Sequence, residues 1–199
     1  MARPNRVDPF GQLQAVPARG EMMGNRGGRF HRDTQTLGTR HWASRQWICC
    51  LCRFKGRQRD VWGRYYTELF FLDEVTALAA GHRPCFECRR EDALAFQHAF
   101  AQPKLRVAAM DAILHAERLD GRNKRLFPAL FSSLPDGAMF AIGQQAFGVK
   151  HGLALAWSFS GYGAPQGLAG AQPVEVLTPP SMIAALRNGF KPRWHSSAA

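Results

Sequence analysis

Two groups of cysteines, widely separated in the chain, constrain the fold of this sequence more than any other feature. Cys85 and Cys88 form a C-x2-C pair directly after Pro84, and a second group lies in the apolar segment WICCLCRF, residues 47–54. A C-x2-C turn lets two thiolates bind one metal ion. An ion with ligands from both groups would hold two distant segments together, so we expect these segments to be neighbours in the fold.

The ligands of this expected metal site depend on how the first group is folded. If residues 47–54 form a regular strand, Cys50 and Cys52 lie on the same face, because side chains alternate along a strand. We therefore predict a zinc site with thiolate ligands from both groups: Cys50, Cys52, Cys85 and Cys88. The side chains that can replace one of these ligands are a further cysteine and several histidines: Cys49, His31, His41 and His82. A redox pair and buried apolar thiols are the alternatives to a metal site.

Turn residues and apolar patterns predict an α+β fold in three parts. Residues 1–40 are rich in Gly, Pro and Arg and show no long periodic stretch, so we expect an extended arm with turns that is partly ordered against the body. Residues 41–104 are expected to form a small zinc-stabilised module of strands and helices. In this module Asp73 is a suitable N-cap for a helix, and Gly81 is suited to end it.

Residues 105–199 are expected to form a mixed C-terminal part. The segment from Val107 to Leu119 has the apolar pattern of a helix, and short apolar stretches follow from Ala138 onwards. Gly143 and Gly152 separate these stretches, which is typical of an antiparallel meander of strands.

The chain carries a large excess of positive charge. It has 26 Lys and Arg residues against 15 Asp and Glu residues, a formal net charge of +11 and a pI near 10.2. Such an excess suits a polyanionic partner, because neutralising phosphates releases counterions, although a basic solvated surface without a ligand is the plainer alternative. No apolar run reaches the roughly 18 residues of a membrane-spanning helix, and the N-terminus lacks the apolar core of a secretory signal. We therefore expect a cytoplasmic protein without a membrane partner, whose cysteines are thiols or metal ligands.

Basic and aromatic residues are interleaved between the two cysteine groups. Tyr65 and Tyr66 are examples of the aromatic residues, which can stack on unpaired bases while cationic side chains follow the phosphates. The basic residues expected to bind nucleic acid lie in this segment and beside the second cysteine pair: Arg53, Lys55, Arg57, Arg59, Arg64, Arg83, Arg89 and Arg90. The alternative is a basic hairpin whose aromatic rings pack inward.

The segment that runs from Leu69 through the sequence Ala-Gly-His-Arg-Pro to Cys88 resembles the N-terminal metal-binding domain of Ada-type DNA alkylation repair proteins. The resemblance implies that Cys85 and Cys88 are the second ligand pair of a zinc–thiolate site. It also implies that one cysteine of an upstream pair accepts a methyl group from a DNA phosphotriester. The sequence departs from that family in its first pair, which is C-x3-C there, and it lacks the family's Pro-Cys-His-Arg motif and helix-turn-helix region. The whole pattern is also similar to that of a family of small bacterial proteins.

These features together predict a zinc-dependent protein that binds nucleic acid, DNA rather than RNA, in a repair or DNA-maintenance role, with a reactive thiolate as an open question. The alternative is a small nuclease or hydrolase. At helical spacing Asp111 and His115 share one face, so His115 with Asp111 or Glu117 can act as a general base. A third hypothesis is a non-catalytic module whose basic surface binds an acidic protein.

Overall fold

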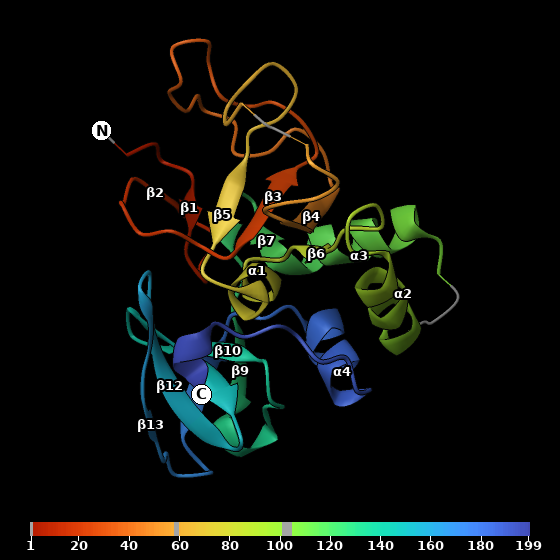
Figure 1. The fold of residues 1–199 in the computed structure, drawn as a ribbon. Coiled ribbons are helices and arrows are strands. Elements are labelled where there is room, and N and C mark those ends of the chain that lie inside the picture. The colour runs from red at the N-terminus through yellow and green to blue at the C-terminus, as the bar shows by residue number, and fades with distance from the viewer. Residues whose placement is uncertain (1, 58–59, 101–104) are drawn as a thin grey trace.

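The computed structural model describes residues 2–57, 60–100 and 105–199, and it confirms the α+β class (Figure 1). Two six-stranded sheets form within these ranges, one from the N-terminal half and one from the C-terminal half, with a small two-stranded sheet beside them. In Figure 1 helix α1 lies between the two large sheets, and α2, α3 and α4 lie to one side. None of the helices in these ranges combines the length and apolarity needed to cross a membrane.

The N-terminal sheet has the strand order β2-β1-β5-β3-β4-β6. Its strands, in chain order, are β1 Arg6–Val7, β2 Leu13–Gln14, β3 Met22–Arg26, β4 Trp47–Leu51, β5 Leu69–Phe71 and β6 Arg83–Pro84. Strand β3 pairs with both β4 and β5 and is buried at every residue. The ordered part of residues 1–40 thus includes an interior strand, whose apolar residues are too few for sequence patterns to detect. The three-part division of the chain stays a prediction.

Helix α1, Glu74–Ala79, is buried on all sides. The Asp73 carboxylate accepts a hydrogen bond from the Thr76 backbone N–H at 2.8 Å, which confirms the expected N-cap. Gly81 adopts a φ of +85° just after the helix, a conformation that favours glycine. A short helix without a solvent-exposed face needs cover on both sides, and the two large sheets provide it.

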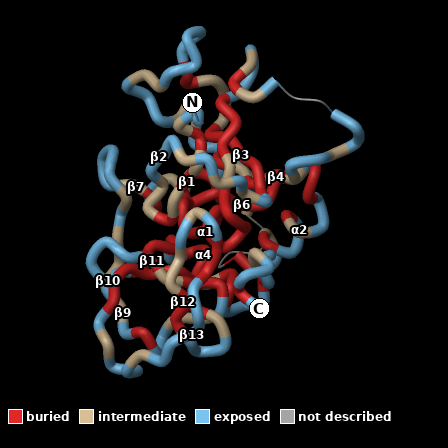
Figure 2. The backbone as a smooth tube through the Cα atoms, turned by 60° about the vertical axis from the view of Figure 1, so that its left-hand side comes forward, coloured by how far each residue is buried: buried red, intermediate tan, exposed pale blue. Residues whose placement is uncertain are grey.

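The two sides of α1 contribute to two different apolar clusters. Ala77 and Ala80 pack with residues of the N-terminal sheet such as Phe71. Val75 and Ala79 pack with residues of the C-terminal sheet. Figure 2 shows the buried backbone concentrated around β3 and α1, with exposed segments at the periphery.

The C-terminal sheet has the strand order β13-β12-β11-β10-β14-β9 and is antiparallel throughout. Its strands are β9 Phe127–Leu130, β10 Met139–Ile142, β11 Gln145–Lys150, β12 Leu153–Ser158, β13 Gly161–Gln166 and β14 Pro173–Val176. The expected meander is confirmed in β10 to β12. Gly143 and Gly152 have φ values of +59° and +70° in the two hairpin turns, as such tight turns require.

Three further helices enclose the largest apolar cluster. They are α2 Arg90–Ala99, α3 Val107–Arg118 and α4 Pro180–Arg187. Phe96, Leu114 and Met182, one from each helix, pack in this cluster with Phe140 of the C-terminal sheet. The two-stranded sheet, β7 Leu119–Asp120 and β8 Asn123–Lys124, directly follows α3.

Candidate metal centre

Three cysteines from the two sequence groups converge in the structure. The sulfur atoms of Cys50, Cys85 and Cys88 all lie within 4.8 Å of one another, and all three residues are buried. Such a cluster of soft donors can hold a metal ion. In the part of the chain that the structure describes, no other group of histidine, cysteine and acidic side chains meets this spacing.

Strand pairing explains why these cysteines meet. Strand β6 pairs in parallel with β4, so that Pro84 lies beside Cys49. The Cys85 backbone N–H donates to the Cys49 carbonyl at 3.0 Å, which places Cys85 next to Cys50. The chain then turns, and the Arg89 backbone N–H donates to the Cys85 carbonyl at 3.0 Å. This turn returns Cys88 towards the other two sulfur atoms, as a C-x2-C metal turn does.

Two of the three sulfur atoms accept hydrogen bonds from backbone N–H groups, which favour the thiolate form that binds a metal. The Glu87 N–H donates to Cys85 Sγ and the Leu51 N–H donates to Cys88 Sγ, both at 3.4 Å. Hydrogen bonds from the Cys50 and Cys88 thiols lower the pKa of Cys85. The same contact with Cys85 raises the pKa of Cys50. The three groups therefore favour a shared negative charge, and a metal ion bound here would displace the remaining thiol protons.

Cys52, expected as the fourth ligand, lies outside the cluster. Strand β4 ends at Leu51, so the alternation that would put Cys52 beside Cys50 stops one residue too early. Cys52 is exposed, and its thiol donates to the Glu21 carbonyl at 3.3 Å. Cys49 lies on the opposite face of β4, and burial raises the pKa of its thiol well above the usual range.

None of the three histidines considered as ligands joins the cysteine cluster. His31 stacks on Trp62 with ring centroids 5.1 Å apart. His82 lies on the far side of the sheet, with its ring 5.0 Å from that of Trp47. His41 is exposed and does not belong to the cysteine cluster. The three-cysteine donor set fits zinc, which retains an open fourth position in sites that contact a ligand or substrate.

The cysteine cluster borders a cavity of about 520 Å³. Because Met23 pairs with both Cys50 and Phe70, the register places Cys50, Asn25 and Glu68 on one face of the sheet. All three of these residues line the cavity. Its other lining side chains include cations, carboxylates and exposed rings: Arg57, Arg64, Asp60, Glu87, Tyr65 and Tyr66. A metal ion at the cysteines would therefore face a mixed polar and aromatic chamber.

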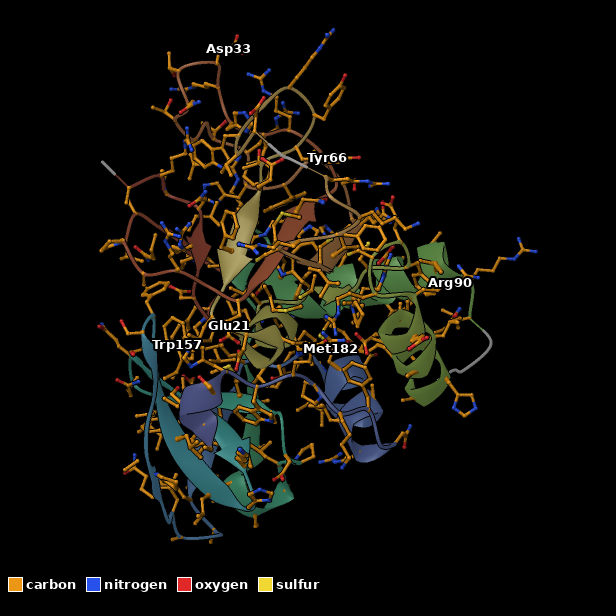
Figure 3. All side chains as sticks on the ribbon, in the orientation of Figure 1. Glu21, Asp33, Tyr66, Arg90, Trp157 and Met182 are labelled. Carbon is orange, nitrogen blue, oxygen red and sulfur yellow. The ribbon has the colours of Figure 1, made fainter. Side chains whose placement is uncertain are left out.

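The basic residues expected to bind nucleic acid have different environments. Those exposed to solvent are Arg53, Lys55, Arg57, Arg64 and Arg90. Arg57 forms an ion pair with Glu87 at 2.7 Å. Tyr65 is 73% exposed and Tyr66 is 49% exposed, so these rings are not part of the core. Figure 3 shows Arg90 extending outward from the start of α2. Arg59 lies outside the described residues.

Arg83 and Arg89 are a correction, because both are buried in ion pairs. Arg83 donates from Nε and Nη2 to the two carboxylate oxygens of Asp111, both at 2.8 Å. Arg89 lies 2.7 Å from the carboxylate of Glu74 and 2.8 Å from that of Asp92. Buried guanidinium groups need such partners. Both arginines hold the turn of Cys85 and Cys88 onto the body of the protein and are not available to phosphates.

The residues of the hydrolase hypothesis do not form a common site. The Asp111 carboxylate is occupied by Arg83, and Glu117 accepts hydrogen bonds from the Ser181 backbone N–H and hydroxyl at 2.9 and 2.6 Å. His115 packs edge-on against Trp42 at 5.9 Å. The side chains of α3 that the sequence suggests as catalytic thus contact neighbouring elements instead.

Two polar residues of the cavity were not identified from the sequence. Asn25 lies in β3, which has no apolar alternation, and Glu68 immediately precedes β5. A buried polar residue next to an apolar strand is a weak signal, and only the register of three strands shows that both face the cysteines. Comparison with protein-family models, with curated proteins and with solved structures gives no match to this chain.

Proposed function

We propose that this chain is a zinc protein that binds nucleic acid, DNA in preference to RNA, with an unpaired nucleotide in the cavity beside the metal. The observation that carries the proposal is the position of the Cys50–Cys85–Cys88 cluster at the wall of a chamber whose other lining includes Arg64 and Tyr65. Metal, cation and aromatic ring would then contact one ligand.

The size and chemistry of the chamber support a nucleotide. Ligand cavities typically measure about 300–1,000 Å³, and a cavity of about 520 Å³ lies within this range. Exposed rings such as Tyr65 and Tyr66 can stack on bases, while Arg64 can bind phosphate. Asn25 already accepts from the Gly27 N–H, and Glu68 Oε2 accepts from the Trp62 N–H. The side-chain NH2 of Asn25 and the second oxygen of Glu68 can therefore contact the polar edge of a base.

The open fourth position gives the metal a role beyond stability. Three thiolates leave zinc with one free site, and here that site would face the cavity. When bound, zinc would polarise a donor atom of the ligand or keep a cysteine in its nucleophilic thiolate form.

A repair or DNA-maintenance role rests on the resemblance to Ada-type proteins. In that scheme a thiolate sulfur attacks the methyl carbon of a DNA methylphosphotriester, the carbon–oxygen bond breaks, and a phosphodiester leaves. Among the upstream cysteines, Cys50 borders the cavity and is the preferred acceptor. Mass spectrometry of protein treated with methylphosphotriester DNA should then find one added methyl group on Cys50. A protein whose mass does not increase would exclude the transfer step.

The free thiols of this chain suit a reducing compartment, and we propose the cytoplasm as its location.

The proposed function is tested by metal analysis and binding on matched variants. Cys85→Ser should lose bound zinc and bind a single-stranded oligonucleotide more weakly, whereas Cys52→Ser should keep both properties because Cys52 is outside the cluster. Wild-type protein should bind single-stranded DNA more tightly than duplex DNA, with affinity falling as salt rises. Stoichiometric zinc in Cys85→Ser, or zinc-loaded wild type without affinity for any nucleic acid, would contradict the proposal.

A further inference from the structure

A cluster of cations lies inside the molecule on the face of β4 opposite to the metal centre. The guanidinium carbons of Arg26 and Arg118 lie over the ring of Trp47, 4.0 and 4.1 Å from its centroid. These arginines are 2% and 1% exposed. The ammonium group of Lys124 lies nearby and donates to the Ala79 carbonyl. The attraction of the indole ring balances part of this positive charge.

Carboxylates supply too little negative charge for this cluster. Asp8 interacts with both Arg26 and Lys124, and burial raises the pKa of its carboxyl group. Asp111 interacts with Arg118, but both of its oxygens already accept hydrogen bonds from Arg83. Among the described residues, the three cations therefore share one carboxylate, that of Asp8, that is not already in an ion pair.

The lowered pKa values of the three cations show the electrostatic cost of this arrangement. Burial lowers the pKa of Arg26 to about 9, and burial with repulsion from Arg26 lowers that of Arg118 to about 9. Burial with repulsion from Arg118 and Arg26 lowers the pKa of Lys124 to about 7. A negative charge among them would raise the pKa of each cation towards its ordinary value.

A buried nitrogen atom of one cavity-lining side chain, Arg118 Nε, lacks a hydrogen-bond partner. The two terminal nitrogens of the same guanidinium donate to the carbonyls of Gly81 and Arg45. Nε is therefore an N–H donor without an acceptor. Buried donors are rarely left unpaired, so the missing partner must be an acceptor.

A small cavity lies against these cations. It measures about 20 Å³ and is lined by Arg26, Trp47, Arg118 and Lys124 among others. A cavity of about 10–15 Å³ suffices for one water-sized particle, so this space excludes a phosphate group or a nucleotide. We propose that the cavity binds a small monovalent inorganic anion of the size of chloride, held by Arg118 and Lys124. The anion supplies the missing negative charge and the missing acceptor behind the sheet that carries the metal centre.

Bromide replaces chloride in such a site and can be located directly. In crystals of the full chain grown in sodium bromide, an anomalous difference peak is expected in the cavity between Arg118 and Lys124. A density peak there without anomalous signal identifies a water molecule and overturns the proposal, as does an empty cavity.

A second test needs only the protein in solution. The unfolding temperature should fall when gluconate, which is too large for the cavity, replaces chloride at constant ionic strength. Above the dissociation constant, each tenfold rise in chloride should add about 1.4 kcal/mol to the free energy of unfolding. Equal unfolding temperatures in the two salts contradict the proposal.

Matched variants then assign the effect to the cavity. Lys124→Met should reduce the dependence on chloride, whereas Arg125→Met, which removes a neighbouring exposed charge, should leave it unchanged. Equal dependence in Lys124→Met and wild type overturns the assignment. If Lys124→Met does not fold, the bromide and gluconate experiments on wild-type protein still decide.

Discussion

The two faces of the N-terminal sheet carry opposite chemistry. One face of β4 presents Cys50 to a cavity lined by solvent-exposed cations and rings, while the other presents Cys49 and Trp47 to buried side chains. The thiols on the first face lie close enough to share one ion. On the second face, cations are packed around an indole ring without enough carboxylates.

The difference between the faces arises because adjacent residues of a strand point to opposite sides of the sheet. Cys49 and Cys50 are neighbours in sequence, but alternation places one in the core and the other in the cysteine cluster. Apart from the candidate metal ligands, whose loss would also remove the ion, groups on the cavity face should therefore affect ligand binding more than stability. Groups on the closed face should affect stability more than ligand binding.

The sharpest way to break the comparison is to substitute the two neighbouring cysteines. Cys50→Ala should lose bound zinc, together with the binding energy that structural zinc supplies, about 10–16 kcal/mol in small zinc domains. Cys49→Ala should keep stoichiometric zinc and lose about 1 kcal/mol of stability, as for one deleted buried heavy atom. Metal analysis with denaturant unfolding measures both, and zinc loss in Cys49→Ala with retention in Cys50→Ala would reverse the assignment.

The buried ion pair beneath the metal turn should give the next largest effect. Asp111→Ala leaves Arg83 charged and unpaired where it is 1% exposed, which should cost about 3–5 kcal/mol. Urea denaturation measures this loss, and Asp120→Ala, which removes an exposed carboxylate nearby, is the control with little expected effect. A stable Asp111→Ala protein would instead favour a functional role for this carboxylate.

Much of the fold was predictable, and the cysteine cluster was predictable in part. Asp73 and Gly81 lie at the start and the end of α1 as expected, and Gly143 and Gly152 lie in the turns of the meander. These features were predictable because caps and turns are local properties. The site needed longer-range information. The pairing of β4 with β6, which puts Cys50 beside Cys85, involves residues far apart in the chain.

Ion pairing was the second obstacle to sequence-based prediction. Arg83 and Arg89 follow the pattern of a basic surface beside a metal, and no local pattern shows that Asp111 and Glu74 would meet them. The same holds for Cys52, whose position depends on where β4 ends.

A change on the cavity face should affect binding without affecting stability. Tyr65→Ala removes an exposed ring and should weaken binding of single-stranded DNA by about 1–3 kcal/mol, the contribution of one stacked base. The free energy of unfolding should stay the same because the ring is 73% exposed. Fluorescence titration measures the affinity. Tyr65→Phe retains the ring and should bind normally, so equal losses in both variants would exclude stacking.

The smallest effect concerns pH and the closed face. Burial and the nearby cations lower the pKa of His82 well below 6.5. The unfolded chain therefore binds a proton before the folded protein does, so stability is complete above pH 6.5 and declines as pH falls below it. His82→Gln should flatten this decline, measured by unfolding at several pH values with zinc in excess. The exposed His98, changed to Gln, should leave the slope unchanged, and an unchanged slope in His82→Gln would contradict the assignment.

The most direct test of the central claim is X-ray absorption at the zinc edge of the purified wild-type protein. Three thiolates with an open position predict three sulfur neighbours at about 2.3 Å and one lighter ligand, oxygen or nitrogen. The spectrum should be the same in Cys52→Ser, because that thiol lies outside the cluster. Four sulfur neighbours in the wild type, or zinc without sulfur neighbours, would contradict the account.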